Sequence, residues 1–305
     1  MSAAVVVVGG AAFIAGFCWR EVLINWSALR RIAIPDGSRQ RVLPSGYYTW
    51  VTGTIVTRGV LGVVVAVMGA ALATQLTESG GQGWARLVCV GLLTVFLVLS
   101  LSRTWPAARQ LVVGTGSRDT QMGGARRLLR YHVAYIAMMA AIVAIQLAMA
   151  EEGAASAAIA AGGAGFVAAT LWNEVLIDRP AARLEVEPSD SDRSTLVGYY
   201  AVMTATLVRP NLATVFLAIC ATVAALVVQL LGTGTPAWAT WTSLAIFAVF
   251  LVLAGLRTWP AAVRLGGNSE SAEMQMRSGQ ILGRYHLAFV IMLFAIAGIQ
   301  LIATV

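Results

Sequence analysis

The sequence contains two histidines, and both stand in the same tripeptide. Residues 130–132 read Arg-Tyr-His, and so do residues 284–286. Imidazole is a common axial ligand of haem iron. If the two histidines faced each other, they could hold a b-type haem, with Arg127, Arg130 and Arg284 near its propionates. One interpretation of the pair is therefore a haem b membrane protein that transfers electrons.

The position of the histidines allows other interpretations. His132 and His286 stand where apolar stretches begin, whereas a haem macrocycle belongs deeper in an apolar layer. Hydrogen bonds to Glu21 or Glu174 would satisfy the imidazoles without a cofactor. The two carboxylates could also act as general acid and base on a lipid-soluble, isoprenoid-like substrate. The sequence has no phosphate-binding loop, zinc-protease motif or nucleophile elbow, so a non-enzymatic function is favoured.

Arginine and aromatic residues also occur in matched pairs, and they offer fixed positive charge beside stacking surface. We expect them to line a cytoplasmic-side vestibule that binds a small anionic or polar ligand in a channel-like or carrier-like protein. The alternative is a non-catalytic membrane subunit or scaffold, with snorkelling arginines and aromatic side chains in the interface belt. The candidate ligand-binding residues are Glu21, Tyr47, Tyr48, Arg103, Trp105, Arg130, His132, Glu174, Tyr199, Tyr200, Arg257, Trp259, Arg284 and His286.

These pairs exist because the second half of the sequence repeats the first at an offset of about 153 residues. Residues 103–108 and 257–262 both read Arg-Thr-Trp-Pro-Ala-Ala, and residues 95–148 share 26 of 54 positions with residues 249–302. We therefore predict two units, 1–150 and 151–305. Each unit has four predicted spans, an even number, so the repeats are parallel. A pseudo-two-fold axis along the membrane normal should relate them.

The composition indicates that lipid is the solvent of this chain. Hydrophobic residues make up 58% of it and charged residues only 11%, compared with roughly 25% charged in soluble domains. All 21 basic residues are arginine, which is typical of a GC-rich bacterial genome and excludes lysine Schiff-base chemistry. No basic run with interleaved aromatic residues accompanies the net charge of +7, so nucleic acid is not an expected partner.

Eight apolar stretches are long enough to cross a bilayer as helices, since a span needs about 20 residues. The predicted fold is all-α, in a multi-pass protein of the cell membrane that could form a homo-oligomer or join a membrane complex. The predicted spans are 3–19, 59–77, 84–102, 131–150, 154–172, 211–231, 238–256 and 285–304.

Arginine distribution predicts the orientation of the chain. Loops 20–58, 103–130, 173–209 and 257–284 hold 20 of the 21 arginines, and cytoplasmic loops carry the excess of positive charge. Both termini are then outside, with Arg86 as the one external arginine. Pro210 suits the first turn of the sixth span, which leaves 198–208, and by the repeat 46–57, as interfacial segments or helix extensions.

Small and amide residues predict how the helices pack. Glycines in the first span and the Ala/Gly-rich fifth span favour a central position or a subunit contact for both. Two pairs of glutamines, Gln75 with Gln229 and Gln146 with Gln300, are expected to make interhelical hydrogen bonds. The three cysteines, which include no CxxC pair, are expected to be buried structural thiols.

Overall fold

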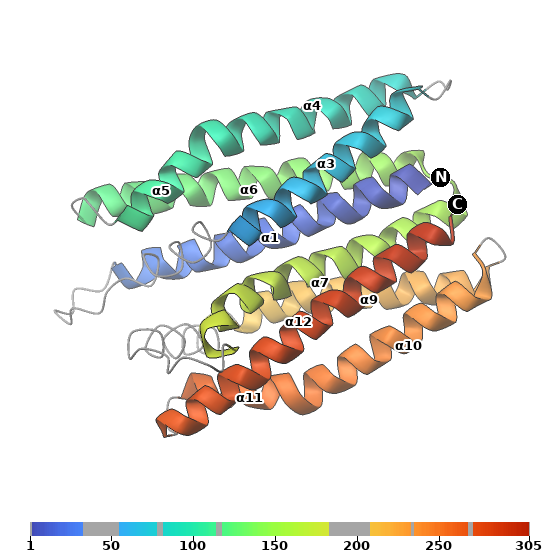
Figure 1. Ribbon diagram of the computed structural model, residues 1–305. Helices are drawn as coiled ribbons and strands as arrows, with labels where there is room; N and C mark the ends of the chain where they lie inside the picture. Colours follow the sequence, from blue (N-terminus) through green and yellow to red (C-terminus); the bar gives the residue numbers. More distant parts are fainter. Residues whose placement is uncertain are drawn as a thin grey trace.

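The computed structural model describes residues 2–32, 55–77, 82–113, 118–182, 208–232, 235–267 and 271–304. Within these ranges the chain is helical and contains no strand (Figure 1). Eight stretches in the described part are long and apolar enough to cross a membrane, so this is a multi-pass membrane protein. The eight predicted spans are confirmed. The helices are α1 Ser2–Ile32, α3 Ile55–Thr77, α4 Gly83–Leu99, α5 Trp105–Val113, α6 Arg118–Met149, α7 Glu152–Ala182, α9 Val208–Leu231, α10 Ala237–Leu253, α11 Trp259–Gly267 and α12 Ala272–Ile302.

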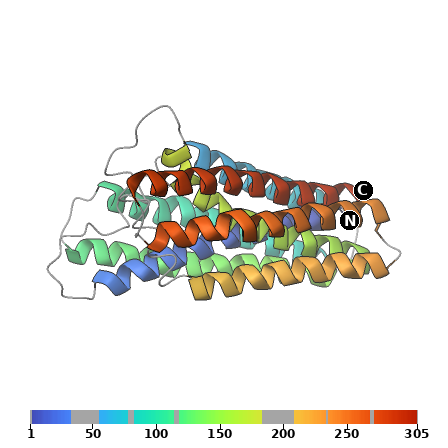
Figure 2. The ribbon, with the colours of Figure 1, turned by 90° about the horizontal axis from the view of Figure 1, so that it is seen from below.

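Both ends of the chain lie together at one end of the bundle (Figures 1 and 2). We call this the terminus end and the other the opposite end. Several helices continue toward the opposite end beyond their apolar spans: α6 begins at Arg118 rather than 131, and α12 at Ala272 rather than 285. The prediction that 103–130 and 257–284 are loops is therefore wrong for most of their length. A helix satisfies its own backbone in water as well as in lipid, so it need not end where apolar residues end.

Helices α1 and α7 form the centre of the bundle, as their small residues predict. Their apolar windows are 56% and 72% buried, against 17–33% in the other spans. Helix α1 packs along α7 and α6, while α7 packs along α12 and α9. In Figure 1, α1 and α7 lie between the two outer groups of helices. A bundle in lipid gains little from burying apolar side chains, so close backbone contact joins these two helices.

Glycine makes this contact possible. A Cβ atom on Gly16 would lie 2.5 Å from the backbone oxygen of Phe166, and one on Gly165 would lie 2.7 Å from the backbone oxygen of Gly9. Both distances are too short for any larger residue. On the far side of α7, a Cβ on Gly163 would lie 2.9 Å from the backbone oxygen of Ala218 in α9. Glycine therefore sets the spacing on two faces of α7.

A pair of buried glutamines ties the helices together near the terminus end of each half. Gln75 and Gln146 donate to each other at 2.9 and 3.0 Å. Gln229 donates to Gln300 at 2.6 Å, and Gln300 donates to the Ser243 hydroxyl at 3.0 Å. The predicted interhelical hydrogen bonds are confirmed. Such bonds satisfy amides that would otherwise be stranded in hydrocarbon.

A π-helical turn continues α4 and another continues α10. These turns are η1, Ser100–Thr104, and η3, Ala254–Thr258. The Trp105 N–H bonds to the Ser100 oxygen and the Trp259 N–H to the Ala254 oxygen. Each tryptophan is followed by proline, which lacks an N–H and crowds the carbonyl four residues earlier. Widening the preceding turn relieves this clash.

Some predicted features differ from the structure or lie outside the described residues. A proline after Trp105 and after Trp259 predicts that a helix ends at each tryptophan. This prediction is wrong, because the chain passes through the π turn into α5 and α11. Cys18 and Cys89 are buried, but Cys220 is exposed on the surface of α9, so the prediction of a buried thiol is wrong there. Most of the predicted interfacial segments, at 46–54 and 198–207, falls outside the described residues.

Candidate functional site

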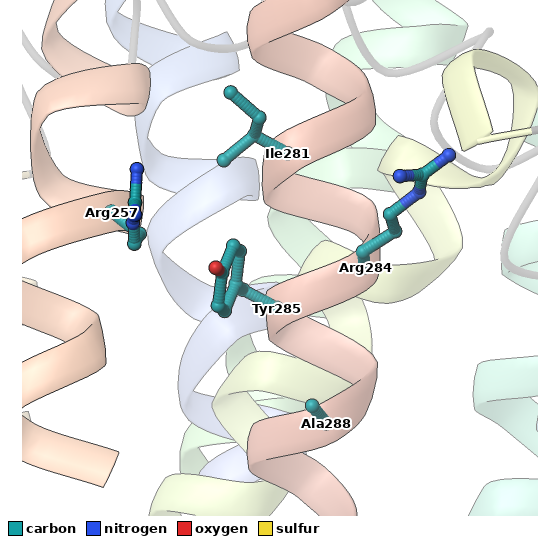
Figure 3. Close-up of a pocket in the computed structure, with 5 residues that line it drawn as sticks. All are labelled: Arg257, Ile281, Arg284, Tyr285 and Ala288. Atoms are coloured by element: carbon teal, nitrogen blue, oxygen red, sulfur yellow. The ribbon is translucent and has the colours of Figure 1, made fainter. Parts of the chain in front are cut away.

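A pocket lies between η3 and α12, toward the opposite end of the bundle. Its volume is about 340 Å³, and its lining consists of Arg257, Ile281, Arg284, Tyr285 and Ala288 (Figure 3). The four α12 residues stand three and four positions apart, so they begin on one face of that helix, but the Arg284 guanidinium extends away from Arg257 (Figure 3). Arg257 comes from the last turn of η3. The π turn and the helical repeat of α12 together build this site.

The pocket combines positive charge with an aromatic surface. Figure 3 shows Arg257 beside the Tyr285 ring, while Arg284 extends from the other side of α12. Both arginines are exposed and Tyr285 is half-buried. The five lining residues include two guanidinium groups and no carboxylate. Guanidinium groups bind carboxylate and phosphate oxygens through paired N–H donors, so an anion fits this chemistry.

Arg103 and Arg130 occupy the positions in the first half that match Arg257 and Arg284. Arg103 lies in the last turn of η1 and Arg130 on α6, and both are exposed. Of the two tryptophans, Trp105 is half-buried and Trp259 exposed. The pocket brings together Arg257 and Arg284 from the second half only. A vestibule lined by both halves stays a prediction.

The two histidines are buried on α6 and α12. His132 is 6% exposed and His286 7% exposed, and the His132 ring lies 6.1 Å from the ring of Tyr135 in an edge-on arrangement. Helices α1 and α7 pass between α6 and α12 (Figure 1), so the packing does not present the imidazoles to each other across a gap. A haem between them stays a prediction that this packing does not support.

The acidic and tyrosine candidates are only partly described. Glu21 is 2% exposed on α1. The side chain of Glu174, and the tyrosines Tyr47, Tyr48, Tyr199 and Tyr200, lie outside the described residues. In the part of the chain that the structure describes, no three His, Cys, Asp or Glu side chains gather as a metal site would require.

Sequence reasoning missed Arg20. The arginine distribution predicts a cytoplasmic loop from residue 20, but α1 continues to Ile32 and the Arg20 side chain is fully buried. The loop boundary was wrong because it was set at the first charged residue. The glycine spacing on α1 could have revealed this, since Arg20 follows Gly16 by one helical turn on the face that contacts α7.

Asn173 is a second buried polar residue that sequence reasoning passed over. It stands on α7 at the position that matches Arg20, and its exposed fraction is 0%. Neither its amide nitrogen nor its amide oxygen has a hydrogen-bond partner. A buried amide in this state is unusual in a native protein and calls for an explanation.

Comparison of the chain with protein-family models, curated proteins and solved structures gives no match.

Proposed function

We propose that this multi-pass membrane protein binds a small anionic ligand at the cytoplasmic ends of its helices, in a channel-like or carrier-like role. The observation that carries this proposal is the pocket lined by Arg257, Arg284 and Tyr285. Arginines at the membrane edge keep contact with water, because a charge at the bilayer centre costs about 2.5–3.5 kcal/mol even on the gentler insertion scale.

The lining chemistry favours an anion over other small ligands. Two arginines along one pocket give it a positive potential, and a bound phosphate or carboxylate offsets this charge. The Tyr285 hydroxyl adds a further donor, and Ile281 and Ala288 add apolar surface. A ligand with one anionic group and a short apolar part fits this combination.

We also propose that two parallel four-helix repeats, 1–150 and 151–305, build the protein. The glutamine pairs on α3 with α6 and on α9 with α12 support this proposal. So do the π turns before Trp105 and Trp259. Both sets of features stand at positions that the sequence alignment matches. A rotation axis along the membrane normal would then pass between α1 and α7.

Binding can be tested with inorganic phosphate as the soluble probe and phosphatidylglycerol as the lipid probe, on the full chain in nanodiscs. We expect Arg257→Ala and Arg284→Ala each to weaken binding at least tenfold. The control is Arg264→Ala on α11, which removes an exposed arginine outside the pocket and should change affinity less than twofold.

The pattern of responses separates the sources of the anion. A loss for phosphatidylglycerol alone identifies a lipid headgroup, and a loss for phosphate identifies a soluble ligand. Equal effects of all three variants, or no effect of any, would contradict the proposal. The exposed Arg103 and Arg130 favour a scaffold as the second candidate, in which arginines only anchor the protein to headgroups.

Orientation has its own test. Reporter fusions at Ser269 and at Val305 should report opposite compartments, with the fusion at Ser269 in the cytoplasm, because the arginine-rich segments are retained there. A cytoplasmic signal from the fusion at Val305 would contradict the proposed topology.

A further inference from the structure

The contact between α1 and α7 contains a polar pair within an otherwise small and apolar interface. The two helices run in the same direction, since Gly9 meets Ala161 and Gly165, and Gly16 meets Phe166 and Ala169. Counting one helical turn from Gly16 reaches Arg20, and one turn from Ala169 reaches Asn173. The register therefore places Arg20 and Asn173 at the same level of the α1–α7 contact.

Both side chains are completely shielded from solvent, with exposed fractions of 0%. They lie near the C-terminal ends of two apolar spans, Ala3–Leu23 and Ala154–Asn173. Buried ionisable residues in membrane spans are expensive, and they mark ligand or ion sites more often than structural ones. The Asn173 side chain gives independent support for a ligand site, because neither its amide nitrogen nor its amide oxygen makes a hydrogen bond.

The available donors define the charge of a ligand here. Asn173 offers two amide hydrogens, and Arg20 offers a permanently charged guanidinium with five N–H donors. Arg20 already interacts within the protein, but five donors allow it to keep that interaction and still bind an anion. The nearby carboxylate of Glu21 stands on another face of α1. It follows Cys18 by one turn, and Cys18 packs with Tyr135 and Phe96 of the first half.

The close approach of the helices limits the size of the ligand. A Cβ on Gly16, one turn before Arg20, would lie 2.5 Å from the Phe166 backbone oxygen, so the helices leave no room for an organic molecule at that level. We propose that the α1–α7 contact at Arg20 and Asn173 binds a single small inorganic anion of the halide class. This site is separate from the pocket of Arg257 and Arg284, and it does not depend on the function proposed for that pocket.

Thermal unfolding of the full chain in nanodiscs tests this site, with chloride as the probe. Chloride replaces gluconate at constant ionic strength, and gluconate is too large to enter the contact. The unfolding midpoint should rise with chloride and then saturate, because a ligand that binds only the folded state stabilises it. Asn173→Leu should raise the apparent chloride Kd at least tenfold, and Arg20→Gln should do the same.

Two controls make the result specific. Thr170→Val removes a buried hydroxyl one turn earlier on α7, which already donates to the Val167 oxygen, and should leave the chloride response unchanged. Arg284→Ala should also leave it unchanged, which separates this site from the pocket. If Arg20→Gln does not fold, Asn173→Leu still decides, because leucine replaces the unpartnered amide with an apolar group of similar size. A midpoint independent of chloride, or a wild-type response in Asn173→Leu, would overturn the proposal in favour of a water-filled contact.

Discussion

The two halves of the bundle share their scaffold contacts but differ in the residues beside them. In the first half, Thr104 of η1 and the Tyr135 hydroxyl of α6 hydrogen-bond to each other. In the second half, phenylalanine stands at the position that matches Tyr135, and Thr258 of η3 donates back to Ala254 in its own helix at 2.9 Å. The π turn forms in both halves. The turn therefore does not depend on the bond across to the neighbouring helix, and the proline that follows it is common to both halves.

The glutamine pairs also combine a contact that both halves share with a neighbouring residue that differs between them. Gln146 also donates to the Cys89 sulfur at 3.7 Å, whereas Gln300 donates to the Ser243 hydroxyl at 3.0 Å. The amide-to-amide bond is present in both halves. The additional acceptor is a cysteine sulfur in the first half and a serine oxygen at the matching position in the second half. We infer that the shared contacts hold the helices in place while residues next to them were free to acquire different roles.

The contact between the halves should show the largest effect of substitution. Gly16→Ala places a methyl group against the Phe166 backbone, which cannot move aside as a flexible side chain would. We expect a loss of about 1–3 kcal/mol in the free energy of unfolding, measured by SDS titration. The control is Gly69→Ala, since a Cβ there meets nothing within 4 Å and alanine favours helix by about 0.5–1 kcal/mol. Equal effects of the two substitutions would show that α1 and α7 do not join the halves.

The glutamine pairs should both respond when one partner is removed. Gln146→Leu leaves the Gln75 amide without its glutamine partner, and Gln300→Leu removes the acceptor of the Gln229 amide, whose oxygen still accepts from the Thr240 hydroxyl at 3.3 Å. Each change should cost about 1–2 kcal/mol in the free energy of unfolding. The double variant Gln75→Leu with Gln146→Leu should recover much of this cost, because no amide is then left stranded. Double-mutant cycles measure the coupling, and the absence of coupling in either half would contradict a shared scaffold.

The smallest effect is expected where the halves differ. Tyr135→Phe makes the first half resemble the second by removing the bond to Thr104. The expected loss is about 0.5–1.5 kcal/mol in the free energy of unfolding. Tyr131→Phe, one turn away on α6, is the matched control and should cost less, since Tyr131 contributes ring stacking against Tyr135. Since Tyr131→Phe keeps this ring, a larger loss at Tyr131 would show that its hydroxyl, and not that of Tyr135, holds this part of α6.

Much of the fold could be predicted from the sequence because hydropathy and repetition act over many residues. Eight spans, the central position of α1 and α7, and the bonding of Gln75 with Gln146 each follow from long-range patterns. The ends of the spans were predicted less well. Hydropathy marks where apolar residues stop, whereas a helix continues as long as its backbone bonds are satisfied.

The same limitation hid part of the candidate site. A charged residue at the end of an apolar stretch predicts the membrane edge, and Arg20 is the exception. Its burial depends on what α7 places opposite it, which hydropathy does not contain and which only the glycine spacing on α1 indicates. Arg257 and Arg284 were predicted from their matched positions, but Tyr285 was not among the candidates, although it stands between Arg284 and His286. Only the geometry of η3 and α12 brings its ring to the pocket.

The connection between α6 and α7 limits how the two halves can move. Helix α6 ends at Met149 and α7 begins at Glu152, so a short strap joins the halves at the terminus end. The glycine contacts at Gly9 and Gly16 hold the adjoining part of α1 against α7. Any separation of the halves would therefore be a hinge motion about the terminus end, with the largest displacement at the opposite end. Arg20 and Asn173 stand one turn beyond the last glycine contact, where α1 and α7 would begin to separate.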